Sequence, residues 1–270
     1  MFLCSLNIMS NKFPAHVRHA MGLASTRRMV QPPRVKTDET VLSQHPGKGY
    51  CTIFDVGAGD GKKCIQWLLE KNNVLVYAFE PDPSQFEKLQ KARNSLDIDQ
   101  KRRLQIFNVA VSNENTDASD FYVCNDHSSS SLLPFVQENL KNWKYPPGRH
   151  FFKTTDIIKV PTIRLDDFMD THSVQYIDFL HIEVQGVVNR VFDSLTSKRL
   201  RHVKEILWKV HITDFEIYKN QATEEPLIEY LKKNNFVTAE RSYYSRNQER
   251  FIRSIHLGWK ERGARIYGFK

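Results

Sequence analysis

The 270-residue sequence has no uninterrupted run of about 18 apolar residues, which argues against a membrane-spanning helix. It has few cysteines, and no two of them form a C-x-x-C pair; they are Cys4, Cys51, Cys64 and Cys124. This scattering argues against a zinc module and a disulfide scaffold, and it fits a reducing compartment. We therefore expect an intracellular protein, in the cytoplasm rather than secreted, and no metal site.

Acidic residues are missing from residues 1–37, which carry six Lys or Arg, and are scarce in residues 241–270, which carry eight Lys or Arg and two acids. The other 203 residues hold 25 basic and 29 acidic side chains, so the net charge of +8 comes from the two ends. A uniformly basic nucleic-acid-binding domain would not show this distribution. Since 40% of the chain is apolar, its length suffices for one large α/β domain with a short extension.

The extension comprises residues 1–46, which contain four prolines and little strand pattern. An acid-free start that contains arginine is typical of a mitochondrial presequence, although the first ten residues carry no basic group. We expect an arm that packs against or tethers the protein, with a mitochondrial transit peptide as the alternative. The domain itself is expected over residues 47–270.

From residue 49 onward, short apolar runs alternate with helical patterns. The helical patterns lie at 62–71, from Ser84, around 188–195 and after Pro226. Apolar runs of strand length are typical of strands that are covered on both faces. The sequence therefore predicts an α/β fold with a doubly wound, mostly parallel sheet, its strands at 53–56, 74–79, 104–111, 177–184 and 206–212.

One connection is too long for a single crossover helix, and we place an insertion at about residues 113–175. Such an insertion can serve as a lid or substrate wall, or it can be a hairpin that extends the sheet edge. Within it we expect a strand at 121–124, a serine run at 128–131, a helix through Val136, Leu140 and Trp143, and a strand at 157–163.

The strongest signal is the segment FDVGAGDG, which places Gly57, Gly59 and Gly61 between a predicted strand and a predicted helix. Glycines permit positive φ and let a ligand approach the backbone. The G-x-G-x-G spacing differs from the dinucleotide-binding and P-loop motifs, so phosphate binding is not favoured. Glu80 lies 19 residues past Gly61, close to the offset at which an acid meets ribose hydroxyls in Rossmann units. The combination indicates a nucleoside-binding site.

These motifs, together with several later ones, resemble the S-adenosylmethionine-dependent methyltransferases of the FkbM type. The resemblance spans roughly residues 50–240, and the order of the motifs is more specific than any one of them. The matching segments are 55–61 (DVGAGDG), 79–81 (FEP), 108–112 (NVAVS), 128–132 (SSSSL), 162–168 (TIRLDDF) and 177–186 (IDFLHIEVQG).

The resemblance implies a Rossmann-like fold with a seven-stranded sheet, and S-adenosyl-L-methionine as the cofactor. By family analogy the glycine loop, with Gly57, Gly59 and Gly61, faces the amino-acid part of the cofactor, and Asp55 helps to hold the ammonium group. Glu80 would take the ribose. The region of Asn108 and Val109 would lie beside the adenine.

Two departures from the family pattern occur near the end of the 177–186 segment. The family usually ends this strand in Asp-x-Glu-Gly, whereas this chain has Glu183 and Gln185 there, and His181 replaces a lysine. Ligands of open α/β sheets bind at the carboxyl ends of the strands. The catalytic candidates are therefore Glu183 and, after the next strand, His211, while His181 is expected to be structural.

The predicted function is O-methylation of a small-molecule or glycan hydroxyl. Two alternatives remain open. The basic ends and the aromatic-basic tail suggest a nucleic-acid or protein methyltransferase, and a steep salt dependence of RNA binding would favour that class. The neutral Gln185 suggests a non-catalytic module that binds S-adenosylmethionine without turnover.

Overall fold

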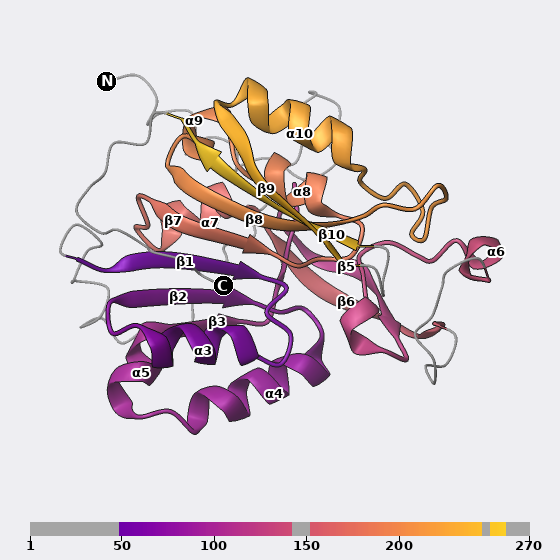
Figure 1. Ribbon diagram of the computed structural model, residues 1–270. Coiled ribbons are helices and arrows are strands. Elements are labelled where there is room, and N and C mark those ends of the chain that lie inside the picture. Colours follow the sequence, from indigo (N-terminus) through magenta and orange to yellow (C-terminus); the bar gives the residue numbers. More distant parts are fainter. Residues whose placement is uncertain (1–48, 142–151, 245–248, 258–270) are drawn as a thin grey trace, which may run out of the picture. The chain divides into compact units, whose positions relative to one another are not determined.

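The computed structural model describes residues 49–141, 152–244 and 249–257, and the predictions for residues 1–46 and for Trp143 lie outside these ranges. Figure 1 shows the arrangement of the elements. Their order is β1 (Cys51–Val56), α3 (Lys62–Glu70), β2 (Val74–Phe79), α4 (Pro83–Asn94), α5 (Ile98–Arg103), β3 (Leu104–Phe107), β4 (Ala110–Val111), β5 (Thr116–Cys124), the 3-10 helix η3 (His127–Ser129), α6 (Gln137–Leu140), β6 (Thr154–Ile163), α7 (Leu165–Thr171), β7 (Ile177–Ile182), α8 (Val188–Asp193), α9 (Ser197–Leu200), β8 (Val203–His211), α10 (Glu224–Lys233), β9 (Phe236–Tyr244) and β10 (Glu249–His256).

The main sheet has seven strands in the order β3-β2-β1-β7-β8-β10-β9. The pairs from β3 to β8 are parallel, and β10 runs antiparallel to both β8 and β9. The prediction of a doubly wound, mostly parallel seven-stranded sheet is confirmed. The strand order reverses beside β1, where β2 lies on one side and β7 on the other, and such a switch point opens a crevice at the carboxyl ends of the strands.

Helices cover both faces of this sheet because successive strand residues point to opposite sides. On one face, Ile53 packs in a cluster with residues of α3 such as Trp67. On the other face, the ring of Phe54 packs edge-on against that of Phe168 in α7, with 5.6 Å between the ring centroids. Figure 1 shows α3, α4 and α5 grouped together, apart from α8 and α10. The sheet core therefore fixes the positions of the strand ends that carry the polar residues.

The predicted strand at 104–111 is two strands, and this interpretation of the sequence was wrong. Residues 104–107 form β3 in the main sheet, whereas Ala110 and Val111 form β4 and pair with β6 in a second sheet of order β4-β6-β5. Asn108 and Val109 form the crossing between the two sheets. The run is apolar on both sides of Asn108, which is exposed at the crossing, and its apolar pattern alone does not show that the chain leaves one sheet for another.

The insertion contains both predicted strands, since 121–124 falls in β5 and 157–163 in β6. These two strands pair antiparallel as a hairpin within the second sheet rather than along the edge of the main one. The helix predicted from Ser84 is α4, which begins one residue earlier, at Pro83. Asp82 caps it, because its side chain accepts hydrogen bonds from the backbone N–H groups of Ser84 and Gln85, which lack helical partners.

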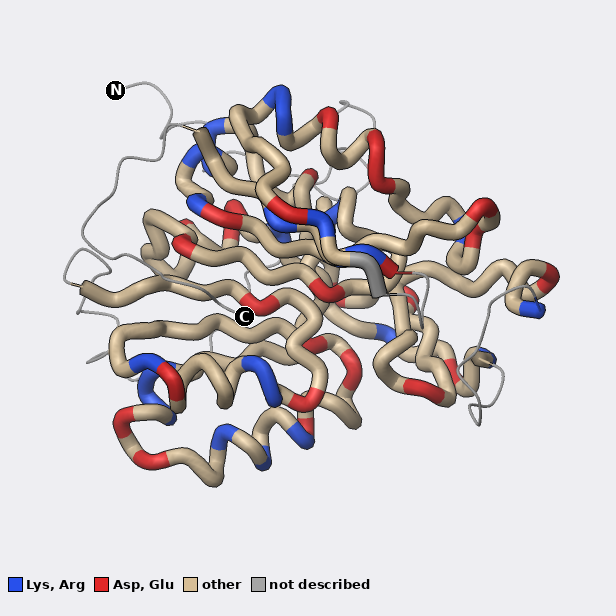
Figure 2. The backbone as a smooth tube through the Cα atoms, in the orientation of Figure 1, with Lys and Arg blue, Asp and Glu red and all other residues tan. Residues whose placement is uncertain are grey.

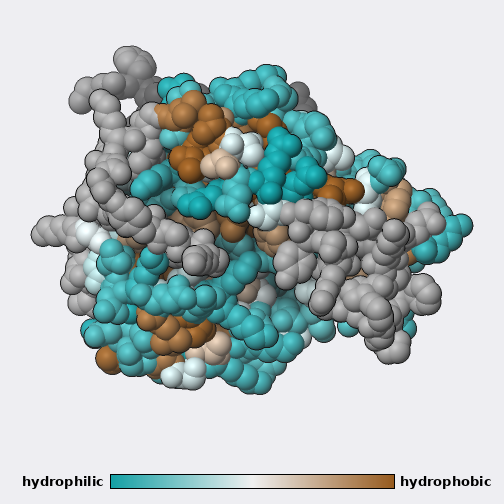
Figure 3. Space-filling model, viewed as in Figure 1, coloured by the Kyte–Doolittle hydropathy of each residue, from teal (hydrophilic) through white to brown (hydrophobic). Residues whose placement is uncertain are grey.

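The described part of the C-terminal tail forms β10 and the end of β9. Ile252 is fully buried against the core. None of the described helices has the length and apolar content that crossing a membrane requires. The surface in Figure 3 is mostly hydrophilic, with separated apolar patches.

Candidate active site

A cavity of about 330 Å³ lies at the carboxyl ends of β1, β2 and β7. Of the residues expected at the site, Asp55, Gly57, Gly59, Glu80, Val109 and Glu183 line it. Gly61, Asn108 and His211 do not line it, but each is hydrogen-bonded to a residue that does: Gly61 to Ala58, Asn108 to Glu80 and His211 to Gln185. The serine segment, residues 127–132 of the insertion, forms the opposite wall through His127, Ser128, Ser130, Ser131 and Leu132.

The glycine loop is held against the ends of the neighbouring strands. The backbone N–H of Gly57 donates to the carbonyl of Phe79 at 3.0 Å. Gly57 has φ of 84°, and a Cβ there would lie 2.4 Å from the carbonyl oxygen of Glu183, so no larger residue fits. Gly59 has φ of 57°, but a Cβ there would meet no described atom within 4 Å. Gly57 therefore serves packing, and Gly59 leaves the backbone open toward the cavity.

Glu80 is a buried carboxylate at the end of β2, held by two backbone donors. Gly59 N donates to Oε2 at 2.7 Å and Asp82 N donates to Oε1 at 2.8 Å. Burial raises the pKa of Glu80 to about 7, although these two hydrogen bonds act in the opposite direction. The amide of Asn108 donates to the Glu80 carbonyl at 2.8 Å, so Asn108 fixes the strand end rather than the cavity wall.

Asp55 is almost fully enclosed, with an exposed fraction of 1%. One carboxylate oxygen accepts from the thiol of Cys64 at 3.0 Å, and the other lies 2.7 Å from Nδ1 of His181. On the far side of the imidazole, Nζ of Lys63 lies 3.0 Å from Nε2. Because an ammonium group can only donate, Nε2 accepts and the ring proton is on Nδ1, directed at Asp55. His181 is thus a neutral bridge between a buried acid and a lysine.

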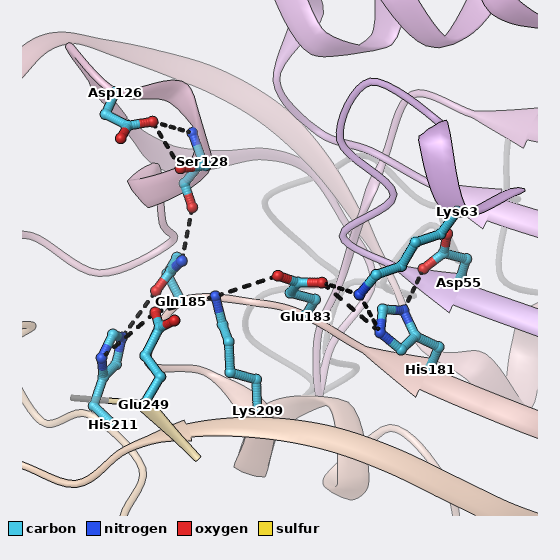
Figure 4. Close-up of polar contacts among 10 residues, drawn as sticks. All are labelled: Asp55, Lys63, Asp126, Ser128, His181, Glu183, Gln185, Lys209, His211 and Glu249. Carbon is cyan, nitrogen blue, oxygen red and sulfur yellow. Dashed lines mark hydrogen bonds and ion pairs between the residues drawn. The ribbon is translucent and has the colours of Figure 1, made fainter. Parts of the chain in front are cut away.

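Lys63 also contacts Glu183, and Glu183 in turn contacts the buried Lys209 (Figure 4). Lys63 Nζ donates to Oε2 of Glu183 at 2.5 Å, and Lys209 Nζ lies 3.7 Å from Oε1. Lys209 is 4% exposed and also pairs with Glu249 at 3.2 Å. Burial would raise the pKa of Glu183, but the charges of Lys209 and Lys63 overcome it and hold the pKa at about 2. Glu183 is an anion at every physiological pH.

Gln185 occupies the family's second acidic position and uses both ends of its amide (Figure 4). Oε1 accepts from Nε2 of His211 at 2.8 Å, and the amide nitrogen donates to the carbonyl of Ser128 at 2.7 Å. Burial and the charge of Lys209 lower the pKa of His211 to about 3, so the ring is neutral. His211 therefore contacts the cavity lining through Gln185.

The serine segment is also attached at its N-terminal end, through His127. Nδ1 of His127 lies 2.7 Å from a carboxylate oxygen of Asp82, the acid that caps α4. In addition, the hydroxyl of Tyr218 donates to the carbonyl of Ser129 at 2.8 Å. The segment therefore spans the cavity from the end of β2 to the end of β7, and the insertion supplies a fixed wall of the site.

Sequence reasoning did not single out Lys63, Lys209, Asp82 or His127 as site residues. Lys209 had a signal, since it follows the apolar segment Ile206–Trp208 of β8, and a charge in a buried strand is rarely without partners. Lys63 and His127 lie among ordinary surface residues in the sequence. Only the packing of distant segments brings them to the cavity.

Comparison with known proteins agrees with this geometry. The model of the family described as "Methyltransferase FkbM domain" matches residues 55–238. The curated 2-O-methyltransferase NoeI of Sinorhizobium fredii (strain NBRC 101917 / NGR234) is 24% identical over 183 residues, which are 66% of this chain and 70% of that protein.

Solved structures with a similar fold have low sequence identity. Streptococcus pneumoniae Sp1610 in complex with S-adenosyl-L-methionine matches with a TM-score of 0.43 and 11% identity, over 84% of this chain and 75% of that one. A protein of the NADB-Rossmann superfamily from Streptococcus agalactiae matches with a TM-score of 0.41 and 12% identity, over 86% of this chain and 73% of that one. The family match covers most of the described sheet and the whole cavity, and the chain belongs to the FkbM family of S-adenosylmethionine-dependent methyltransferases.

Proposed function

We propose that the protein transfers the methyl group of S-adenosyl-L-methionine to a hydroxyl of a small molecule or a glycan. The observation that carries this proposal is the cavity at the strand switch point, where the open backbone of Gly59 meets the buried carboxylate of Glu80. The similarity to NoeI, a 2-O-methyltransferase, supports oxygen as the methylated atom.

The residues present fit this cofactor. Each oxygen of Glu80 uses one lone pair on a backbone donor, so each retains a further lone pair for one hydroxyl of a ribose diol. Gly57 and Gly59 would bring the loop backbone close to the ligand, and Val109 supplies an apolar contact at the end of β3. Asn108 and Gly61 would support these residues from behind. The sulfonium of the cofactor supplies the electrophilic methyl group.

The chain's own task is to hold the acceptor near that methyl group and to exclude water. An apolar part of the cavity wall serves this purpose, formed by Phe121, Leu132, Val184 and Val187. Fixing two reactants in a productive geometry can lower the barrier by about 7–11 kcal/mol. The rigid attachment of the serine segment at both ends suits this role.

The candidates for a base differ in their surroundings. Glu183 holds its proton too weakly to be an efficient base at neutral pH, and His211 does not line the cavity. Both therefore fit an electrostatic or positioning role. A neutral imidazole can accept a proton on one ring nitrogen, and a carboxylate on Nδ1 orients the ring. We propose His127, which lines the cavity and pairs with Asp82, as the acceptor of the hydroxyl proton.

The charge distribution favours a small or glycan acceptor over a nucleic acid. Basic and acidic residues are interspersed along the described elements (Figure 2). Two arginines of the C-terminal tail are paired with acids, Arg250 with Glu224 at 2.6 Å and Arg253 with Glu205 at 2.7 Å. A paired arginine has less of its charge available for phosphates.

Thermal unfolding with S-adenosylhomocysteine tests the donor half of the proposal. A ligand at 100 times its Kd stabilises by about 2.7 kcal/mol, which raises the Tm of a domain of this size by roughly 5–10 °C. Transfer of a labelled methyl group to a panel of glycans and small hydroxyl compounds tests the acceptor half. Absence of a thermal shift at millimolar ligand would refute the proposal, and binding without transfer to any acceptor would favour a non-catalytic module.

A further inference from the structure

The residue expected to hold the cofactor's ammonium group is already engaged. Asp55 is 1% exposed, and its two carboxylate oxygens contact Cys64 and His181. A direct contact with a ligand cation would require that one of these buried partners be displaced. Another anion of the cavity is therefore better placed for this role.

Lys63 and Glu183 offer such an anion together with a cation. Both line the cavity, their side chains are 44% and 32% exposed, and they form one ion pair. The methionine end of S-adenosylmethionine is an α-amino acid, which carries one carboxylate and one ammonium group. We propose that the Lys63–Glu183 pair binds this zwitterion, with Lys63 on the carboxylate and Glu183 on the ammonium. This inference rests on the proposed function.

The surroundings keep both charges in place when a ligand arrives. If Lys63 turns toward a ligand carboxylate, Lys209 still lies 3.7 Å from Glu183 and stabilises its negative charge. Lys209 also pairs with Glu249, so a movement of Lys209 away from Glu183 would break its ion pair with a second, buried acid. Lys209 is thus a positioning residue for Glu183.

The replacement of the family's lysine by His181 agrees with this assignment. Nε2 of the imidazole accepts a hydrogen bond from Lys63, and Nδ1–H donates one to Asp55. The ammonium group of Lys63 therefore lies where it can reach both His181 and Glu183 (Figure 4). The cation that the family carries on the strand is supplied here by helix α3. Asp55 then acts through His181 and Lys63 rather than on the ligand.

A comparison of two ligands distinguishes the contribution of the amino-acid end of the cofactor to binding from that of the nucleoside end. S-adenosylhomocysteine carries the zwitterion, whereas 5′-methylthioadenosine has the same adenosine and sulfur without it. We expect Lys63→Met and Glu183→Gln each to weaken binding of S-adenosylhomocysteine about tenfold or more, because each removes one partner of a charge pair. Calorimetry should show the affinity for 5′-methylthioadenosine unchanged within about twofold.

The exposed pair of Lys91 and Glu87 on α4 provides matched controls. Lys91→Met and Glu87→Gln remove the same charges away from the cavity, and we expect neither to change the affinity for either ligand. Retained binding of 5′-methylthioadenosine also shows that a site variant is folded. A variant that shows no cooperative thermal unfolding is replaced by Lys63→Gln or Glu183→Ala, for which the same selective loss of affinity for S-adenosylhomocysteine is expected.

Equal losses for the two ligands, or no loss for either, would overturn the inference and leave the proposed function standing. So would a wild-type protein that binds both ligands equally well, since the zwitterion would then contribute nothing. A wild-type protein that binds neither ligand would instead refute the proposed function, and the inference with it.

Discussion

Cofactor affinity should depend on pH through Glu80. A ribose diol donates two hydrogen bonds, and only the ionised carboxylate can accept both, because a protonated carboxyl group has become a donor on one oxygen. Burial and the nearby charges of Asp82 and Asp55 raise the pKa of Glu80 to about 7, against its two backbone donors. The ionised fraction is then about one tenth at pH 6 and nine tenths at pH 8. Affinity should therefore rise about tenfold over this range.

The suitable probe is 5′-methylthioadenosine, which has the diol but no amino group that titrates near neutrality. Its Kd would be measured by calorimetry at half-unit steps between pH 5.5 and 8.5. The control is Glu80→Gln, which preserves the size of the side chain and removes the titration. In that variant we expect weaker binding and a flat profile. His127→Asn, which removes the imidazole that contacts Asp82, serves as the second control and should keep the slope.

A flat profile in the wild-type protein would refute this reasoning, and so would a slope that persists in Glu80→Gln. The former result would mean that the ligand does not depend on an ionised Glu80. The latter would assign the slope to a different group in the cavity.

Stability without ligand should respond in the opposite direction. Between pH 4.5, the ordinary value for glutamate, and about 7, the folded protein retains a proton on Glu80 that the unfolded chain has lost. The free energy of unfolding should therefore fall by about 3 kcal/mol as the pH rises through this window. Urea unfolding of the wild type and of Glu80→Gln would measure the difference, and parallel profiles for the two proteins would contradict the assignment.

Two further sets of variants test the loop and the serine segment. Gly57→Ala should unfold more easily by several kcal/mol, because its Cβ would overlap the Glu183 carbonyl, whereas Gly59→Ala should cost only about 1–2 kcal/mol for its positive φ and should chiefly weaken ligand binding. Urea unfolding and calorimetry distinguish the two, and equal losses of stability would contradict the different roles. Gln185→Glu should cost about 1–3 kcal/mol, because a carboxylate would face the Ser128 carbonyl; a Tm equal to that of the wild type would show that this contact is unimportant.

The sequence by itself determined the fold class and the residues at the strand ends that line one side of the cavity. Gly57, Gly59 and Glu80 follow strands directly, and the carboxyl ends of parallel strands meet at one edge of a sheet. Their proximity is therefore a consequence of local spacing. The same logic placed Glu183 at the end of a neighbouring strand.

Only the tertiary structure decided which charges meet. Asp55 and His181 are 126 positions apart, and Lys63 and Glu183 are 120 apart, yet each pair is in contact. The first pairing follows from the register of β1 against β7, in which Asp55 and His181 are direct partners. The second follows from the packing of α3, which carries Lys63, beside the end of β7. The periodicity of a sequence contains no information on the register between distant strands. The sequence could therefore place Asp55 at the end of a strand, but it could not show that both carboxylate oxygens contact Cys64 and His181.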